Sequence, residues 1–186
     1  MERRQQREEE LLNLIQNALK RVDPYEVVRN HVSYDPDSGH VEVSETPLDR
    51  HSATADREIV EWTLSSDQEV YVLGSGKAAV TMARALEEIF HDRIRGGLVI
   101  VPQGVAEPLQ RVQAQEGSHP LPDASSLAST YELIDLSQKI PDGSLVFSLL
   151  SGGSSALLCM PAEGLELDEL AVTHQLLLTS GANIHE

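Results

Sequence analysis

Short apolar runs alternate with segments of helical spacing from Glu69 to the end of the chain. The apolar runs are typical of strands and read "VYVLG", "GLVIV", "LQRVQA" and "SLVFSLL". Apolar residues recur at helical spacing over residues 76–91 and 167–180, and Asp123 is placed to cap a helix that runs to about Lys139. Strands that alternate with helices favour a parallel sheet. The predicted fold class is therefore α/β, with a Rossmann-like parallel sheet and helices on both faces.

The first 68 residues follow a different pattern. Residues 5–21 are predicted to form an amphipathic helix, and Asp23-Pro24 to begin a second helix that runs through Asn30. The turn cluster "YDPDSGH" precedes the strand-like "HVEVSE", and a further helix is predicted at residues 54–64. We therefore divide the chain into a helical and linker segment, residues 1–68, and a Rossmann-like domain, residues 69–186, on which that segment packs.

The charge of the chain is unbalanced, since 30 acidic residues oppose 14 basic ones and the net charge is −16. An acidic surface repels phosphates, so neither nucleic acid nor an anionic membrane is a predicted partner. No apolar run reaches the ~20 residues of a membrane-spanning helix. The lone Cys159 excludes an intrachain disulfide and suits a reducing cytoplasm. High salt would screen the self-repulsion, so we predict a halophilic cytoplasmic protein; the alternative is a merely acidic mesophilic one.

Three loops follow strands of the predicted sheet, at the edge where ligands bind in folds of this class. They are Gly74–Lys77, Val101–Gly104 and Ser151–Ser155, and the loop "GSHPLPD" is expected near them. The first and third loops are rich in glycine and serine, and they are the candidate binding loops.

The loop Gly74-Ser75-Gly76-Lys77 fits the dinucleotide pattern G-x-G-x-x-A, but the next strand ends in "VIVPQG" without the acid that would hold a ribose. A Walker A loop is excluded, because Tyr71 stands at its first glycine and Ala78 at its hydroxyl. Lys77 falls in the first turn of a helix, where the dipole disfavours a cation by about 0.3–1 kcal/mol. A phosphate or carboxylate bound at the helix N-terminus would explain this lysine. The alternative is a lysine that is solvated or paired with a nearby acid.

The loop Ser151-Gly152-Gly153-Ser154-Ser155 is a second candidate for binding an anion. Its two glycines allow backbone N–H groups to turn inward, and its three serines add hydroxyl donors. Two alternatives are a flexible turn between strand and helix, and a nucleophile elbow centred on Ser154. In such a hydrolase His119 and Asp123 would be the partners of Ser154, although His119 also suits a rigid loop that donates one hydrogen bond to a substrate. The other histidines have no metal-ligand spacing, so no metal site is predicted.

Five segments, taken in order, resemble the N-terminal domain of the glycerate 2-kinase family, the class II glycerate kinases. They read "VLGSGKAAVTMARALEE", "GGLVIVPQG", "GSHPLPDASS", "LVFSLLSGGSSALLCMPAEGLELDEL" and "LLLTSGANIHE". The resemblance runs from about Asp23 to the end and is densest from Val70. It implies a kinase that transfers the terminal phosphoryl group of ATP to D-glycerate and gives 2-phosphoglycerate, in a cleft between two α/β domains.

The resemblance also implies roles for particular residues. Lys77 matches a lysine regarded as catalytic in the family, where it would neutralise the transferring phosphate or hold the glycerate carboxylate. The serine-glycine loop would cradle another anionic group, and Mg²⁺ would bridge the nucleotide phosphates. His119 and Asp123 would belong to a substrate loop, and Asn183 and Glu186 match positions near the cleft.

Two features depart from the family pattern. Ser154 stands where the family usually has a third glycine, so its side chain either crowds a backbone contact to phosphate or adds a hydroxyl donor. The chain stops at "GANIHE", before the second domain, called MOFRL, that supplies a catalytic arginine. We therefore predict an N-terminal fragment that is inactive alone and is completed by the missing C-terminal domain or by a partner chain; a homo-oligomer is also consistent with the sequence. The alternatives are a serine hydrolase that uses Ser154, a non-catalytic fragment that binds a partner, and an NAD-dependent reductase of hydroxypyruvate.

Overall fold

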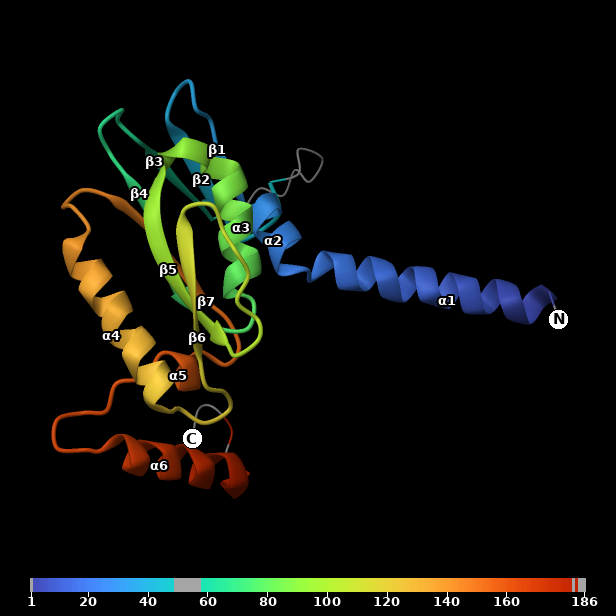
Figure 1. The fold of residues 1–186 in the computed structure, drawn as a ribbon. Coiled ribbons are helices and arrows are strands. Elements are labelled where there is room, and N and C mark those ends of the chain that lie inside the picture. The colour runs from blue at the N-terminus through green and yellow to red at the C-terminus, as the bar shows by residue number, and fades with distance from the viewer. Residues whose placement is uncertain (1, 49–57, 182, 184–186) are drawn as a thin grey trace.

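The computed structural model describes residues 2–48, 58–181 and 183. Two sheets lie side by side in the body of the molecule, and one long helix projects from it (Figure 1). One sheet has four parallel strands and the other has three antiparallel strands. The predicted α/β class is confirmed, and the parallel sheet is the part that carries the candidate binding loops.

The parallel sheet has the strand order β6-β5-β4-β7. Its strands are β4 (Val70–Ser75), β5 (Ile94–Pro102), β6 (Val112–Gly117) and β7 (Leu145–Leu150). All four had been predicted, although β6 begins three residues after the start of the predicted segment "LQRVQA". Because β4 and β7 are neighbours, the loops that follow them leave the sheet at the same edge.

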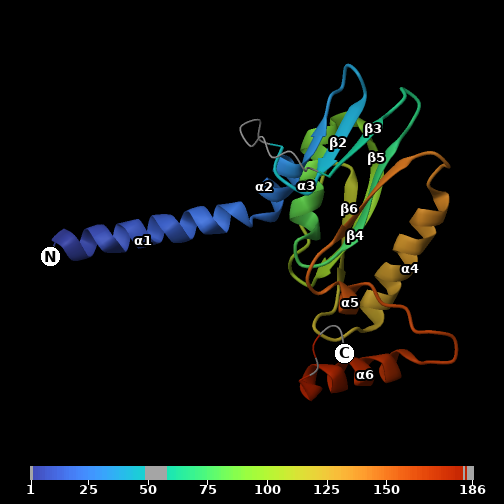
Figure 2. The ribbon, with the colours of Figure 1, turned by 180° about the vertical axis from the view of Figure 1, so that it is seen from behind.

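Helices cover both faces of this sheet, as Figures 1 and 2 show from opposite sides. On one face, α3 (Ala79–Phe90) packs over Val72, Val99 and Val101, and Phe90 stacks against Tyr34. On the other face, Leu98 and Ile100 pack against Leu157 and against apolar residues of the opposing helix. The helices on that side are α4 (Ala124–Lys139) and the short α5 (Ser154–Leu157), and α6 (Leu167–Ser180) follows them across the end of the sheet. Neighbouring residues of β5 thus point to opposite faces, which explains why the run Leu98–Val101 is apolar throughout.

The antiparallel sheet was only partly predicted. Its strands are β1 (Val32–Tyr34), β2 (His40–Ser44) and β3 (Ile59–Thr63), in that order across the sheet. The strand at "HVEVSE" is confirmed, but the helix predicted at residues 54–64 is wrong over β3, and residues 54–57 lie outside the described residues. Ile59, Val60, Trp62 and Thr63 are β-branched or aromatic, and pairing with β2 provides the backbone hydrogen bonds that favour a strand.

The two predicted N-terminal helices are confirmed as α1 (Glu2–Arg21) and α2 (Pro24–His31). The Asp23 carboxylate caps α2 by accepting hydrogen bonds from the backbone N–H groups of Tyr25 and Glu26. Helix α1 projects away from the sheets (Figures 1 and 2), and its apolar residues are largely exposed. Within the described part of the chain, no helix is both long and apolar enough to cross a bilayer.

Candidate functional site

The loops after β4 and β7 are joined into one unit by hydrogen bonds. The backbone N–H of Lys77 donates to the carbonyl oxygen of Gly152 at 3.0 Å, and that of Ala78 donates to the Ser151 hydroxyl at 3.0 Å. In return, the N–H of Ser151 donates to the carbonyl oxygen of Ser75 at 3.2 Å. The two loops predicted to bind anions therefore form a single candidate site at the carboxyl edge of the sheet.

Two glycines are required by the close approach of these loops. Gly76 has a φ of 125°, and a Cβ at this position would overlap the Ser151 hydroxyl. Gly153 has a φ of 96°, and its Cβ would lie 2.9 Å from the ring of His119. Both positions combine a left-handed backbone with a neighbour that leaves no space for a side chain. The glycines thus hold the two loops together and bring His119 to them.

Lys77 is an exposed cation beside this junction. Its Cε lies 3.6 Å from the position that a Cβ of Gly153 would occupy, so Lys77 and the His119 ring both lie beside Gly153. No carboxylate among the described residues forms an ion pair with Lys77, whereas Lys139 is paired with Asp135. Helix α3 has no acid in its first turn and no side-chain cap. The geometry therefore disfavours the paired-lysine alternative and leaves a free ammonium group beside the N-terminus of α3, which has no side-chain cap.

The Ser154 hydroxyl is engaged with the backbone. Its Oγ lies 2.7 Å from the carbonyl oxygen of Ser75 and 2.8 Å from that of Ser151, to which it donates. No hydrogen bond links Ser154 to a histidine within the described ranges. The Ser154 side chain therefore ties the loop after β7 to the end of β4. A glycine at this position could not form these hydrogen bonds.

Asp123 acts as the N-cap of α4, as predicted. Its carboxylate accepts hydrogen bonds from the backbone N–H of Ser125 at 2.8 Å and of Ser126 at 3.2 Å. The Ser125 hydroxyl, followed by these N–H groups, lowers the pKa of the Asp123 carboxyl below its ordinary value. The Asp123 carboxylate is therefore used to cap α4. Among the described residues no hydrogen bonds link Asp123, His119 and Ser154 into a catalytic triad.

A pocket of about 290 Å³ lies between these loops and α6. His119, Gly153 and Ser155 line one side of it, and His174 and Leu177 line the other. His174 was missed by the sequence analysis, although it shares a helix face with Leu177 and Leu178, at spacings of three and four residues. The pocket combines an apolar wall with two imidazoles and one hydroxyl, which suits a small polar ligand.

The remaining predicted site residues are placed as follows. Gly74 and Ser75 are buried in β4, and the Ser75 hydroxyl has no hydrogen-bond partner within the described ranges. The backbone N–H of Gly104 donates to Glu116 at 2.8 Å, which ties the loop after β5 to β6. Asn183 is exposed, and Glu186 lies outside the described residues.

The chain matches a protein family over residues 10–186, which the family description names a domain of unknown function, DUF4147. A protein from Pyrococcus horikoshii named glycerate 2-kinase is 35% identical over 94% of this chain and 35% of its own length. A crystal structure of a protein from the same species superposes with a TM-score of 0.74 at 33% identity, over 94% of this chain and 35% of that one. This likeness extends beyond the loops to nearly the whole fold.

A protein from Agrobacterium vitis with a different name is also similar. It is named a putative hydroxypyruvate reductase and is 38% identical over 62% of this chain and 30% of its own length. The chain thus spans about a third of the length of the relatives it matches. The family match covers nearly all of the chain, and the resemblance predicted from the sequence is confirmed: the chain belongs to the DUF4147 family and corresponds to the N-terminal region of its glycerate kinase relatives.

Proposed function

We propose that this chain provides the N-terminal half of the active site of a kinase that phosphorylates D-glycerate to 2-phosphoglycerate with ATP. The observation that carries the proposal is the free ammonium group of Lys77 at the junction of two glycine-rich loops. Phosphoryl transfer depends on positioning and on positive charge at the transferring group, and needs little covalent chemistry from the protein. The name of the Pyrococcus relative supports the same reaction.

The residues divide into two groups in this proposal. Lys77 and the start of α3 hold the transferring phosphate or the glycerate carboxylate, while Gly153 lets the ligand approach the backbone. His119 and Ser155 line the adjoining pocket and donate hydrogen bonds to the hydroxy acid.

The donors at this edge fit a nucleotide better than a bare metal ion. Hydroxyls, imidazoles and an ammonium group surround the junction, and the nearby Asp123 carboxylate is used as a helix cap. When bound, Mg²⁺ would neutralise and bridge the nucleotide phosphates, which are its main ligands in such sites. Lys77 would supply the positive charge that the protein itself contributes.

The site is completed, in our proposal, by a C-terminal domain or by a partner chain, so that the present chain is inactive alone. The support is that the relatives are about three times as long as the chain. A further support is the exposed apolar surface of α6, beside the pocket, which includes Leu176, Leu177 and Leu178. We also propose a cytoplasm of high salt as the working environment, because salt would screen the net charge of −16.

The experiment compares this chain with a protein extended through the region that its relatives carry. Both are assayed in molar KCl with ATP, Mg²⁺ and D-glycerate, and 2-phosphoglycerate is detected through enolase. The expected result is activity in the extended protein alone. Activity in the short chain would overturn the claim of incompleteness, and no activity in a folded extended protein would overturn the proposed reaction.

A second candidate is a reductase of hydroxypyruvate, which is favoured by the name of the Agrobacterium relative and by the G-x-G-x-x-A pattern at Gly74. Strand β5 ends at Pro102 without the acid that usually holds the ribose of NAD. Oxidation of NADH by the extended protein in the presence of hydroxypyruvate would establish this second reaction. If NADH is not oxidised and glycerate is phosphorylated, the kinase is the activity that the extended protein has and the reductase is excluded.

A further inference from the structure

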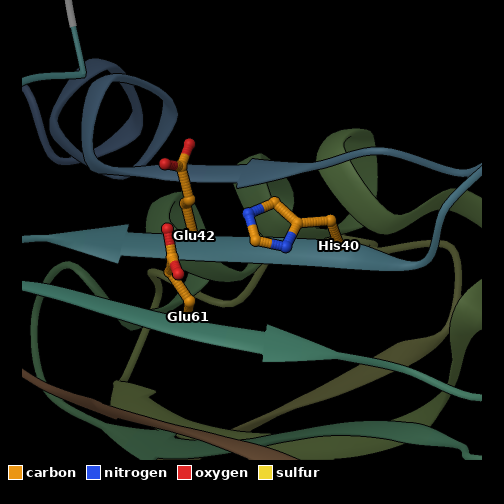
Figure 3. A group of neighbouring side chains, drawn as sticks. All are labelled: His40, Glu42 and Glu61. Atoms are coloured by element: carbon orange, nitrogen blue, oxygen red, sulfur yellow. The ribbon is translucent and has the colours of Figure 1, made fainter.

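The antiparallel sheet brings together a histidine and two glutamates that belong to no part of the proposed kinase site. His40 and Glu42 lie on β2 and Glu61 lies on β3, and Figure 3 shows their side chains on one face of the sheet. One ligand atom from each residue lies within 4.8 Å of those of the other two. The histidine spacing in the sequence had predicted no metal site, because one ligand comes from the neighbouring strand.

The strand register explains why these three side chains converge. Residues two apart on a strand point to the same face, which places His40 beside Glu42. Glu61 pairs directly with Glu42 across the two strands. Two like charges in this position repel each other and destabilise the sheet unless a cation lies between them.

No lysine or arginine in the described part of the chain forms an ion pair with either of these two glutamates. Some exposed acids elsewhere in the molecule are paired with an arginine, as in Arg29–Glu88, Arg95–Glu69 and Arg111–Asp92. No ion pair involving a described residue is formed by Glu42 or Glu61, and neither carboxylate is bonded to His40. The Glu42 carboxylate accepts a hydrogen bond from the Ser33 hydroxyl of β1 at 3.3 Å.

We infer that His40, Glu42 and Glu61 bind a divalent cation of the zinc type. An imidazole nitrogen with two carboxylate oxygens is a ligand set for Zn²⁺ or Ni²⁺, whereas Mg²⁺ prefers six oxygen ligands, several of them water. The Ser33 hydroxyl orients Glu42 from outside the ligand set. Because the ligands come from two strands, the bound ion joins β2 to β3.

The chain carries its own reporter for this site. Trp62 is the single tryptophan of the sequence, follows Glu61 directly and is 48% exposed. Ni²⁺ has unpaired electrons and quenches indole fluorescence at short range. Trp62 therefore serves as a nearby optical probe on the opposite face of β3, and this readout is independent of any enzymatic activity.

The test titrates Zn²⁺ by calorimetry, and Ni²⁺ by the fluorescence of Trp62, into the untagged chain and its variants. We expect one Zn²⁺ per chain, quenching by Ni²⁺, and no displacement of either ion by Mg²⁺ in excess. His40→Asn and Glu61→Gln each weaken binding by about tenfold or more, as loss of a ligand does. The control Glu45→Gln removes an exposed carboxylate just beyond β2 and leaves the affinity unchanged.

Three results would overturn the inference. They are the lack of Zn²⁺ binding to the folded wild-type chain, equal affinity in the wild type and in both ligand variants, and equally tight binding of Mg²⁺. Circular dichroism of each variant without metal shows whether the sheet is intact, and His40→Gln serves as a second histidine variant if His40→Asn is not. Because these readouts use the short chain and no nucleotide, their outcome is independent of the proposed kinase activity.

Discussion

The carboxyl edge of the parallel sheet and the polar face of the antiparallel sheet are opposite in charge. At the first, Lys77 lies beside backbone N–H groups and forms no ion pair among the described residues. At the second, Glu42 and Glu61 face each other beside His40, and no lysine or arginine among the described residues pairs with them. In both places the uncompensated charge identifies the kind of ligand, an anion in the first and a cation in the second. The predictions below test this difference.

The largest effect is expected from Lys77→Ala in the protein extended through the C-terminal region. Loss of the positive charge removes stabilisation of the transferring phosphate, and kcat/KM should fall by about 10²–10³-fold. The matched control is Lys139→Ala, which removes a lysine on α4 that is paired with Asp135. A fall of less than tenfold in Lys77→Ala, or an equal fall in the control, would contradict the role of Lys77.

Gly76→Ala should separate the two loops. The added Cβ overlaps the Ser151 hydroxyl, and the left-handed backbone is strained for alanine, so we expect a loss of roughly 1–3 kcal/mol in the free energy of unfolding. Urea unfolding measures the loss. Gly152→Ala is the control, because its Cβ meets nothing within 4 Å and its φ is ordinary. Equal stability of the two variants would show that the loops do not depend on Gly76.

Asp123→Ala removes the cap of α4 and should cost about 1 kcal/mol at pH 7. The folded protein holds the pKa of Asp123 below its unfolded value, so its ionisation stabilises the fold above the unfolded pKa. This contribution is lost as the pH falls through the folded pKa. The stability gap between the wild type and the variant, measured by urea unfolding at several pH values, should therefore narrow in acid. A gap that is constant from pH 7 to acid would contradict the role assigned to the charge.

Ser154→Ala should have the smallest effect. Each of the two carbonyl oxygens that accept the Ser154 hydroxyl also accepts a backbone N–H, so neither is left alone and the expected loss is about 0.5–1.5 kcal/mol. Glycerate phosphorylation by the extended protein should stay within tenfold of the wild type, and a fluorophosphonate probe should not label the chain. Labelling of the wild type that disappears in Ser154→Ala would instead favour the serine hydrolase.

The two regions also differ in how far the sequence predicts them. The parallel sheet was predicted strand by strand, because β4, β5 and β7 are apolar runs and α3 has regular helical spacing. The sequence predicts a helix over the exposed "IVEWT" of β3, since the strand character of this segment depends on pairing with β2. Local patterns predict buried elements well and predict paired exposed strands poorly.

The sequence motifs predict which loops form the candidate site, but the contacts between those loops and the neighbouring elements are seen only in the structure. Glycine and serine in the loops after β4 and β7 indicated that both could bind an anion, and the topology joined them. The contact of His119 with Gly153 depends on how the loops after β6 and β7 meet, and the position of His174 in the pocket depends on how α6 crosses the sheet edge. The cross-strand pair Glu42–Glu61 likewise depends on a register that the sequence does not show.

The most direct test of the anion site is an NMR titration of the 20.4 kDa chain with pyrophosphate. Backbone amide signals of the loops after β4 and β7 should shift together and saturate, while those of β2 and β3 stay fixed. The same titration of Lys77→Ala should leave the loop signals unchanged. Shifts that are scattered over the surface, or equal in the wild type and in Lys77→Ala, would contradict the claim that these two loops and Lys77 form an anion site.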